Sequence, residues 1–390
     1  MPAPLNNTLP TQRINYLDSV RGLAALAVVF YHFIGWRWDK APDKLLQFNL
    51  TSLVFNGSDA VSLFFVLSGL VLSWKYFYPN ESLVIDGPHY REYVLNRVVR
   101  LYLPFLAALL LVYYYSIHHH GDNLVLVSEF VTNKFGWMEE ALLIRGKHDL
   151  YLPGWTLEVE MVGSLLLPFL VLLLRYNRQL FVMLLAVLLV LGSVFFMSTL
   201  GHFMLGMLLT YYFPRIAGYD LRQSKLYPFR FLLYLLVFAL FSARHLTRIY
   251  PLGELANYWL GMLRLDLFHF TGLGAFGILA YIINSPRLQR LLVSKPLLFL
   301  GRISYSVYLV HWYFVGQVMN DWDKYSAPFT NSKVAFLVLL AATVTATLLF
   351  ATVFNVLFER PAIRLGKRLG ARFAPRPQLV PTPVVQPLQA

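Results

Sequence analysis

Long apolar segments alternate with shorter polar ones along most of this chain. A helix needs about 20 residues, with a range of about 17–25, to cross the hydrocarbon core of a bilayer. Ten apolar segments approach or exceed that length, at about 17–36, 57–75, 99–117, 155–174, 179–197, 199–214, 228–243, 257–283, 297–319 and 333–358. The pattern predicts an all-α, polytopic membrane helix bundle of about ten transmembrane helices, in which the short sixth and seventh segments are broken or tilted.

The positive charges predict which side of the membrane each connecting segment faces. Lys and Arg concentrate on the cytoplasmic side of membrane proteins. If the N-terminus is cytoplasmic, every inner segment holds at least two of these residues, and the inner side holds the majority. One missed helix would invert all later segments and destroy this bias. We therefore expect both termini in the cytoplasm and a multi-pass protein of the cell membrane (the inner or plasma membrane).

The composition favours a membrane protein over several other classes. Of the 390 residues, 57% are hydrophobic and 14% are charged, whereas soluble globular proteins carry about 25% charged residues. The absence of cysteine excludes thiol chemistry and Cys-ligated metals. Because inner-side cations explain much of the net charge of +13, we expect membrane lipids and no nucleic acid as partners. We expect a transmembrane domain over 1–370 and a disordered, Pro-rich cytoplasmic tail over 371–390.

The first apolar segment carries ionisable residues, which are costly inside a membrane and point to function. Arg21 and His32 are eleven residues apart, so they share one helix face at a separation of about 16 Å. Asp18 lies close to the same face, and this polar stripe predicts a face that lines a cavity. His32 is the candidate general base, because imidazole titrates near neutral pH. The alternative is a structural histidine bonded to a neighbouring helix.

The third and fourth segments add charged candidates. Arg97 and Arg100 form an RxxR pair on one face, which suits a cytosolic polyanion because Arg grips phosphate bidentately; the alternative is ordinary inner-side anchoring. Glu158 and Glu160 are about 200° apart on a helix, so only one can point into the bundle. We take Glu160 as a catalytic candidate that orients an imidazole or pairs with Arg. The alternative is an interfacial glutamate beside Trp155, itself a candidate substrate contact.

The second segment has one candidate catalytic acid and one close-packing site. Asp59 lies at its outer end and is a second candidate partner for an imidazolium. Gly69 permits close approach of another helix. Ser68 is assigned to packing, because no nucleophile-elbow motif surrounds it.

The ninth segment supplies a second polar stripe. Ser304, Tyr308 and His311 lie near one face by their spacing. Tyr305 and His311 are candidate substrate contacts, although His311 is also consistent with a satisfied core histidine. In the eighth segment, a local structural cluster is expected from Arg264, Asp266 and His269, and the run 118–120 of three histidines is assigned to a solvated loop. No metal site is predicted.

Six short motifs, in this order on ten predicted spans, resemble the membrane-bound acyltransferase-3 family. They are the R-x10-H of Arg21 and His32, SDAVSLFFVLSGLVLS (58–73), RVVR (97–100), GWTLEVE (154–160), GRISYSVYLVH (301–311) and FERP (358–361). The resemblance covers about 14–365. Leu70 and Thr156 depart from the usual Phe and Ser.

This resemblance implies transfer of an acyl group, often acetyl, from cytosolic acyl-CoA to a hydroxyl of a cell-surface glycan or related acceptor such as a lipid-linked sugar. It implies that His32 is the catalytic histidine, that Arg21, Arg97 and Arg100 handle the acyl donor, and that Glu160 is the glutamate of the fourth-helix motif. No permanently bound cofactor is expected, since acyl-CoA is a substrate. The alternative reading is a transporter or flippase of a lipid-linked sugar, which would need no acyl-CoA and for which we detect no inverted repeat.

Overall fold

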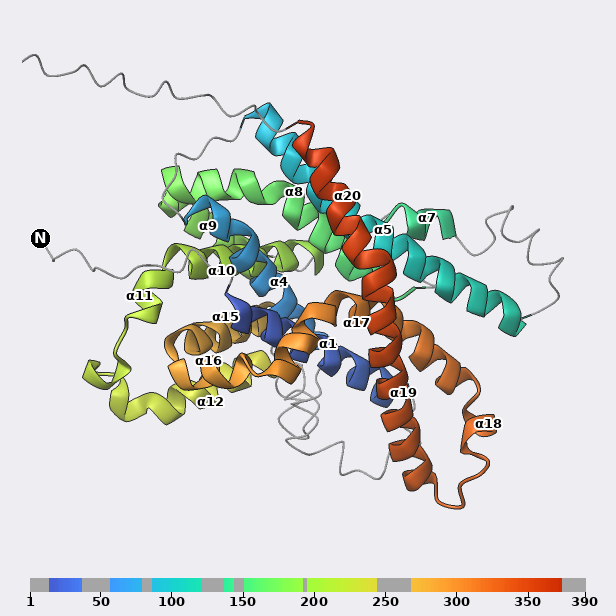
Figure 1. Cartoon of the computed structure of the whole chain (residues 1–390). Coiled ribbons are helices and arrows are strands. Elements are labelled where there is room, and N and C mark those ends of the chain that lie inside the picture. Colours follow the sequence, from blue (N-terminus) through green and yellow to red (C-terminus); the bar gives the residue numbers. More distant parts are fainter. Residues whose placement is uncertain are drawn as a thin grey trace, which may run out of the picture.

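The computed structural model describes residues 14–36, 57–78, 86–120, 137–143, 151–191, 195–243 and 268–373. The regular secondary structure of these residues is helical throughout, and none of them forms a strand (Figure 1). The predicted all-α bundle is therefore confirmed for the described part of the chain. The predicted tail lies outside the described residues from 374 onward. Arg264 and Asp266 of the eighth predicted segment also lie outside them.

The long helices form the body of the bundle. They are α1 (Asn15–Trp36), α4 (Gly57–Ser73), α5 (Gly87–His120), α8 (Gly154–Tyr176), α9 (Arg178–Leu191), α10 (Phe195–Tyr211), α12 (Arg230–Phe241), α15 (Phe268–Asn284), α17 (Lys295–Asn320) and α19 (Ser332–Phe354). Shorter pieces are α7 (Trp137–Ala141), α11 (Phe213–Ala217), α16 (Pro286–Leu292), α18 (Trp322–Ser326) and α20 (Arg360–Ala371). Each predicted apolar segment overlaps at least one of the long helices where the structure describes it, and residues 257–267 of the eighth segment lie outside the described residues.

Several of these helices are suited to crossing a membrane. Within the described residues, five meet the length and apolarity needed, over Asn15–Gly35, Asp59–Tyr76, Gly87–Tyr115, Gly154–Tyr176 and Ser332–Ala371. Shorter apolar helices cover Arg178–Leu189, Tyr227–Phe241 and Phe270–Asn284.

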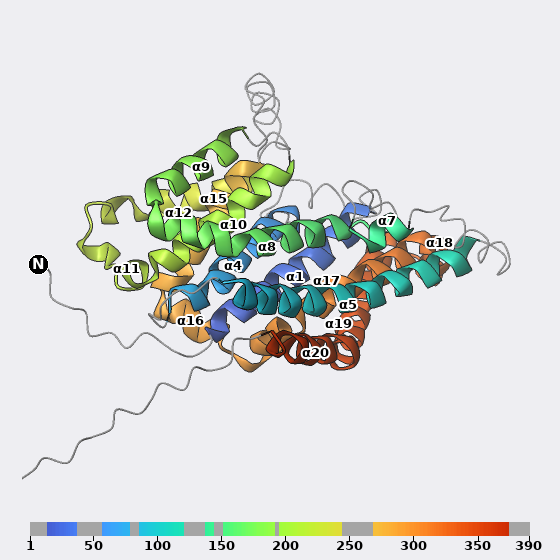
Figure 2. The same cartoon turned by 90° about the horizontal axis from the view of Figure 1, so that it is seen from above.

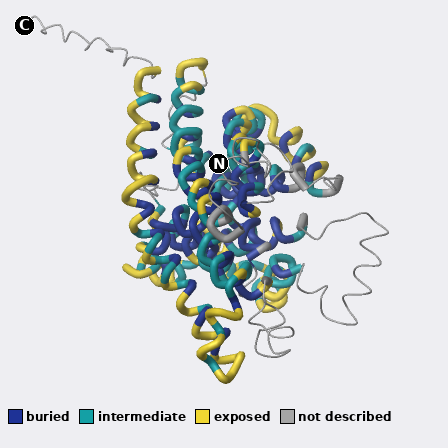
Figure 3. Tube along the Cα trace, turned by 90° about the vertical axis from the view of Figure 1, so that its right-hand side faces the viewer, coloured by how far each residue is buried: buried dark blue, intermediate teal, exposed yellow. Residues whose placement is uncertain are grey.

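Large apolar side chains on the outside of the bundle point to a lipid environment. None of the residues of α12 is buried, and Phe231, Leu232 and Leu235 are 68%, 62% and 62% exposed. Figure 3 shows the buried residues gathered in the middle of the bundle and the exposed ones along the outer helices. Burying such surface in hydrocarbon is favourable, so these outer faces are suited to lipid contact.

Two helix boundaries differ from the predicted segments. α5 begins at Gly87 rather than near 99, because Asp86 caps it: the Asp86 carboxylate accepts hydrogen bonds from the His89 backbone N–H at 2.8 Å and from His89 Nδ1 at 2.6 Å. These hydrogen bonds lower the pKa of Asp86. The run 118–120 was expected in a loop, but it forms the last residues of α5. The side chains of this run and of His269 lie outside the described residues. The predicted segment 179–197 is divided between α9 and α10.

Helices α1 and α17 pack side by side in parallel through the middle of the molecule (Figure 2). A Cβ on Gly22 would lie 2.6 Å from the Gly301 backbone nitrogen, so the two backbones touch there. His32 contacts His311 further along. Both pairs have the same offset of 279 residues, which shows that the helices run in the same direction without a change of register.

We expect this glycine contact to be intolerant of a methyl group. In Gly301→Ala, the added Cβ meets the backbone of Asp18 and Ser19, and backbone atoms cannot move aside as a side chain can. Overpacking of this kind costs about 1–3 kcal/mol. Gly316→Ala is the matched control on the same helix, because a Cβ there meets nothing within 4 Å. Thermal unfolding in detergent checks this: equal midpoints for the two variants would contradict the expectation.

Helix α19 continues through a π-helical turn, Asn355–Glu359, into α20. The continuous helix Ser332–Ala371 has 40 residues, of which the basic α20 forms the last part, and at 1.5 Å per residue it is about 60 Å long. That is about twice the hydrocarbon thickness. The small residues Gly366 and Gly370 of α20 lie against Asn96, so α20 packs on the beginning of α5 (Figures 1 and 2).

Candidate active site

A cavity of about 570 Å³ lies among α1, α4, α5, α8, α17 and the start of α20. Basic side chains described in its wall are those of Arg21, Arg97, Arg100, Arg302, Arg360 and Lys367. Acidic side chains described there are those of Asp18, Glu160 and Glu359. The described wall therefore carries more formal positive charge than negative, which suits an anionic ligand.

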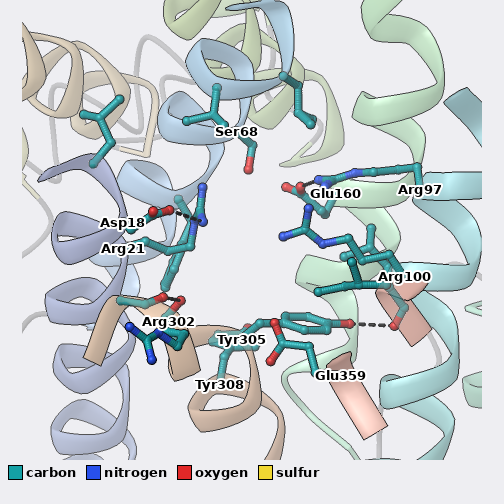
Figure 4. Close-up of a pocket in the computed structure, with 18 of the residues that line it drawn as sticks. Asp18, Arg21, Ser68, Arg97, Arg100, Glu160, Arg302, Tyr305, Tyr308 and Glu359 are labelled. Atoms are coloured by element: carbon teal, nitrogen blue, oxygen red, sulfur yellow. Dashed lines mark hydrogen bonds and ion pairs between the residues drawn. The ribbon is translucent and has the colours of Figure 1, made fainter. Parts of the chain in front are cut away.

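The first-helix arginine and the RxxR pair meet across this cavity. Figure 4 shows Arg21 projecting from one side and Arg97 and Arg100 from the other. Arg21 Nη1 lies 3.3 Å from Asp18 Oδ1, one turn earlier on α1. The expectation that Arg97 and Arg100 face the same way is confirmed. Of the predicted stripe of Asp18, Arg21 and His32 on α1, Asp18 and Arg21 line the cavity and His32 does not.

Glu160 forms a partly buried ion pair with Arg97 (Figure 4). Arg97 Nε also donates to Ser164 Oγ at 2.9 Å, so α8 holds this guanidinium at two points. Of the two glutamates of the fourth-segment motif, Glu160 lines the cavity and Glu158 does not, as their spacing predicts. Of the two functions weighed for Glu160, the structure places it against an arginine and not against the His32 ring.

A second hydrogen-bonded cluster comes from the π-helical turn. The Glu359 carboxylate accepts from Ser306 Oγ at 2.6 Å and from Asn355 Nδ2 at 2.7 Å. Arg360 Nε donates to Asn355 Oδ1 at 3.0 Å. These contacts tie the FERP motif to α17 and place Arg360 on the cavity wall. With Arg302 and Lys367, these residues were not identified from the sequence, although FERP marked their neighbourhood.

Hydroxyl-bearing side chains of α8 and α17 form part of the cavity wall. Thr156 Oγ1 and Tyr308 OH share a hydrogen bond of 2.6 Å, and Thr156 Oγ1 donates to the Pro153 carbonyl at 2.9 Å. Tyr305 OH donates to the Leu101 carbonyl at 2.6 Å. The hydroxyl of Thr156 explains why this departure from the usual Ser is conservative.

His32 is not part of the cavity wall described above; it contacts His311, which lies three residues after Tyr308 on α17. Its Nδ1 is 2.9 Å from Nε2 of His311, and the two ring planes are inclined by 13° with centroids 5.1 Å apart. Trp312 meets His32 edge-on at 5.3 Å. His311 is fully buried, and its Nδ1 lies 2.6 Å from the Tyr308 carbonyl oxygen. Both ring nitrogens of His311 are therefore engaged within the protein.

Two further candidate residues are Asp59 on α4 and Trp155 on α8, and both pack within the bundle. Asp59 is buried in the first turn of α4, whose Gly57 packs against Tyr31, the neighbour of His32. Trp155 packs edge-on against Phe65 with ring centroids 6.1 Å apart.

The packing expectations for Ser68 and Gly69 have different outcomes. Gly69 packs against the Phe203 backbone, which confirms close helix approach. Ser68 was assigned to packing, but its side chain lines the cavity (Figure 4), because the cavity adjoins this face of α4. Among the described residues, no group of three or more His, Asp or Glu is placed to hold a metal ion.

A family model described as an acyltransferase domain matches residues 14–354, from the start of α1 to the end of α19. The chain therefore belongs to the membrane-bound acyltransferase-3 family. With its several apolar helices, it is a multi-pass membrane acyltransferase. Searches of curated proteins and of solved structures give no match.

Proposed function

We propose that this protein is an O-acyltransferase that moves an acyl group, most simply acetyl, from cytosolic acyl-CoA to a hydroxyl of a cell-surface glycan or lipid-linked sugar. The observation that carries the proposal is the basic cavity in which Arg21, Arg97 and Arg100 meet. Arg21 lies on α1, the helix that also bears His32, and the two residues are about 16 Å apart along the helix axis. The family match supports the acyl transfer itself.

The proposed topology has ten spans, with both termini in the cytoplasm of a cell whose plasma or inner membrane holds the protein. The inner-side cations support this orientation. In it, the beginning of α1 and the basic wall of the cavity face the cytosol, where acyl-CoA is found. His32 then lies in the outer half of its span, closer to a glycan acceptor.

The donor is proposed to enter with its phosphates at the basic wall. Arg100 and Arg21 face the cavity and offer planar guanidinium groups, which bind phosphate bidentately. The ion pair with Glu160 holds the Arg97 guanidinium in this wall. Tyr305, which also lines the cavity, is proposed to contact the acyl-CoA. The acyl arm then extends past Tyr308 toward His32. Acyl-CoA acts as a substrate and leaves as CoA.

In the proposed reaction, His32 takes the proton of the acceptor hydroxyl while its oxygen attacks the thioester carbonyl carbon. The carbon–sulfur bond breaks, and the CoA thiolate recovers the proton from the His32 imidazolium. The products are an ester and CoA with a free thiol. Asp59, buried in the helix turn beside Tyr31, is the proposed acid that favours the imidazolium. Glu160 contributes by holding Arg97 in place. Trp155 is proposed to contact the acceptor.

The donor site is tested by thermal unfolding of the purified protein with acetyl-CoA. A ligand at 100 times its dissociation constant stabilises by about 2.7 kcal/mol, so a clear rise in midpoint is expected. The variant Arg97→Gln/Arg100→Gln should lose that rise. The matched control is Arg175→Gln/Arg178→Gln, which removes the same charge at the same spacing from exposed positions away from the cavity.

The same preparation distinguishes an acyltransferase from a lipid-linked sugar flippase. An acyltransferase incubated with radiolabelled acetyl-CoA and membranes should place labelled ester on a glycan or lipid-linked sugar. A flippase predicts neither stabilisation by acetyl-CoA nor a labelled product, and that result would overturn the proposal.

A further inference from the structure

The hydrogen bonds around His32 and His311 have a defined direction. The Tyr308 backbone carbonyl oxygen can only accept, and it lies 2.6 Å from His311 Nδ1. Two lone pairs would repel at that distance, so His311 Nδ1 carries a hydrogen. In a neutral imidazole, the other nitrogen then has none. His311 Nε2 is thus an acceptor that faces His32.

His311 is held as a neutral ring by its surroundings. It is 0% exposed, and its two hydrogen-bond partners are an uncharged carbonyl and another imidazole. Its neighbours on α17 include Val307 and Val310, both fully buried in an apolar cluster. A second proton on this ring would put a charge in that cluster, which is costly without a charged partner.

The tautomer of His32 follows from that of His311. Its Nδ1 lies 2.9 Å from an atom that only accepts, so His32 Nδ1 must carry the hydrogen and donate it. His32 Nε2 is then the nitrogen with the free lone pair. We infer that His311 is a positioning residue that fixes His32 in the Nδ1–H tautomer, so that Nε2 is the atom that takes the proton. This inference rests on the proposed role of His32 as general base.

The two rings are held by rigid elements rather than by loops. Positions 22, 25, 29 and 32 of α1 and 301, 304, 308 and 311 of α17 follow the alternating spacing of three and four residues typical of a coiled-coil seam. The Gly22–Gly301 contact and the His32–His311 contact lie at its two ends. The Tyr308 side chain is anchored in turn to Thr156 on α8.

The arrangement also suits the charge that forms during the reaction. When His32 Nε2 takes the acceptor proton, the ring becomes a cation whose Nδ1–H still points at the His311 Nε2 lone pair. The hydrogen bond becomes charge-assisted and stronger. The proton leaves from the same Nε2 to the CoA sulfur, so His311 itself neither gains nor loses a proton.

The tautomer is measurable without any activity assay. Protein labelled with ¹⁵N-histidine gives distinct ring-nitrogen signals for protonated and unprotonated nitrogens, and the His32→Gln spectrum identifies those of His32. We expect the hydrogen of His32 on Nδ1 in the unmodified protein, and on Nε2, the nitrogen favoured in free histidine, in His311→Leu. A hydrogen on Nε2 in the unmodified protein would overturn the inference.

The kinetic test compares two variants of His311. His311→Leu removes the acceptor and should lower kcat by about 10²- to 10⁴-fold, with stabilisation by acetyl-CoA unchanged. His311→Gln offers an amide oxygen to His32 Nδ1 and should recover most of that loss. His202→Leu is the control, because it removes another fully buried histidine of the bundle away from this contact, and kcat should stay within a few-fold of wild type.

The outcomes separate this inference from the proposed function. Wild-type kcat in His311→Leu, or an equal loss in the Leu and Gln variants, would overturn the positioning role. An active His32→Ala variant together with the expected Nδ1–H signal would instead overturn the general-base proposal and leave the tautomer assignment standing.

Discussion

Replacing His32 with alanine is expected to lower the kcat of acyl transfer by about 10²- to 10⁴-fold, the usual contribution of a general base. No imidazole then remains to take the proton of the acceptor hydroxyl. Stabilisation by acetyl-CoA should persist, because the basic cavity wall does not include His32. The measurement is transfer of labelled acetyl groups to a glycan in membranes with matched protein levels.

The control for this experiment is His89→Ala, which removes an imidazole near the beginning of α5 whose side chain is 42% exposed. Its activity should match that of the unmodified protein. If His32→Ala transferred acetyl groups at the wild-type rate, the base would have to be another group and the proposed mechanism would be wrong.

The second large effect is expected at the ion pair between Arg97 and Glu160. Removing one partner of a buried pair leaves an uncompensated charge and costs about 3–5 kcal/mol. Both side chains are largely buried, at 10% and 15% exposure. Arg97→Leu should therefore lower the unfolding free energy strongly, measured by thermal unfolding in detergent, and Ser164 Oγ should lose its donor as well.

A double variant shows whether the loss comes from the stranded carboxylate. Arg97→Leu/Glu160→Leu replaces both charges with apolar groups, which is often close to neutral for a buried pair, so it should recover part of the stability. Arg91→Leu, at an exposed position on the same helix, controls for loss of positive charge. A double variant that is no more stable than Arg97→Leu would contradict this account.

The helices of the bundle could be located from the sequence because the thickness of the bilayer sets the length of a helix that crosses it. A segment that must satisfy its backbone inside hydrocarbon is helical and about 20 residues long, and the described part of each predicted segment overlaps a helix. Boundaries that depend on local caps escaped this reasoning, as at Asp86. Helical spacing also placed Arg97 and Arg100 on one wall and separated Glu160 from Glu158.

The partners of these residues were not predictable in the same way. Spacing within one helix shows which face a side chain occupies, but not which distant helix meets that face. Glu160 was equally compatible with an imidazole or an arginine, and only the packing of α8 against α5 decided for Arg97. The contact between His32 and His311 joins residues 279 positions apart, and Lys367 reaches the cavity because α20, which continues α19, packs along α5.

The matched register of α1 and α17 constrains the number of residues between the glycine contact and the histidine contact on each helix. From Gly22 to His32 and from Gly301 to His311 the chain climbs ten residues, or about 15 Å. One inserted residue in either stretch would turn its imidazole by about 100° and lift it by about 1.5 Å. Between Gly22 and His32, and between Gly301 and His311, natural variation should therefore consist of substitutions and not of insertions or deletions.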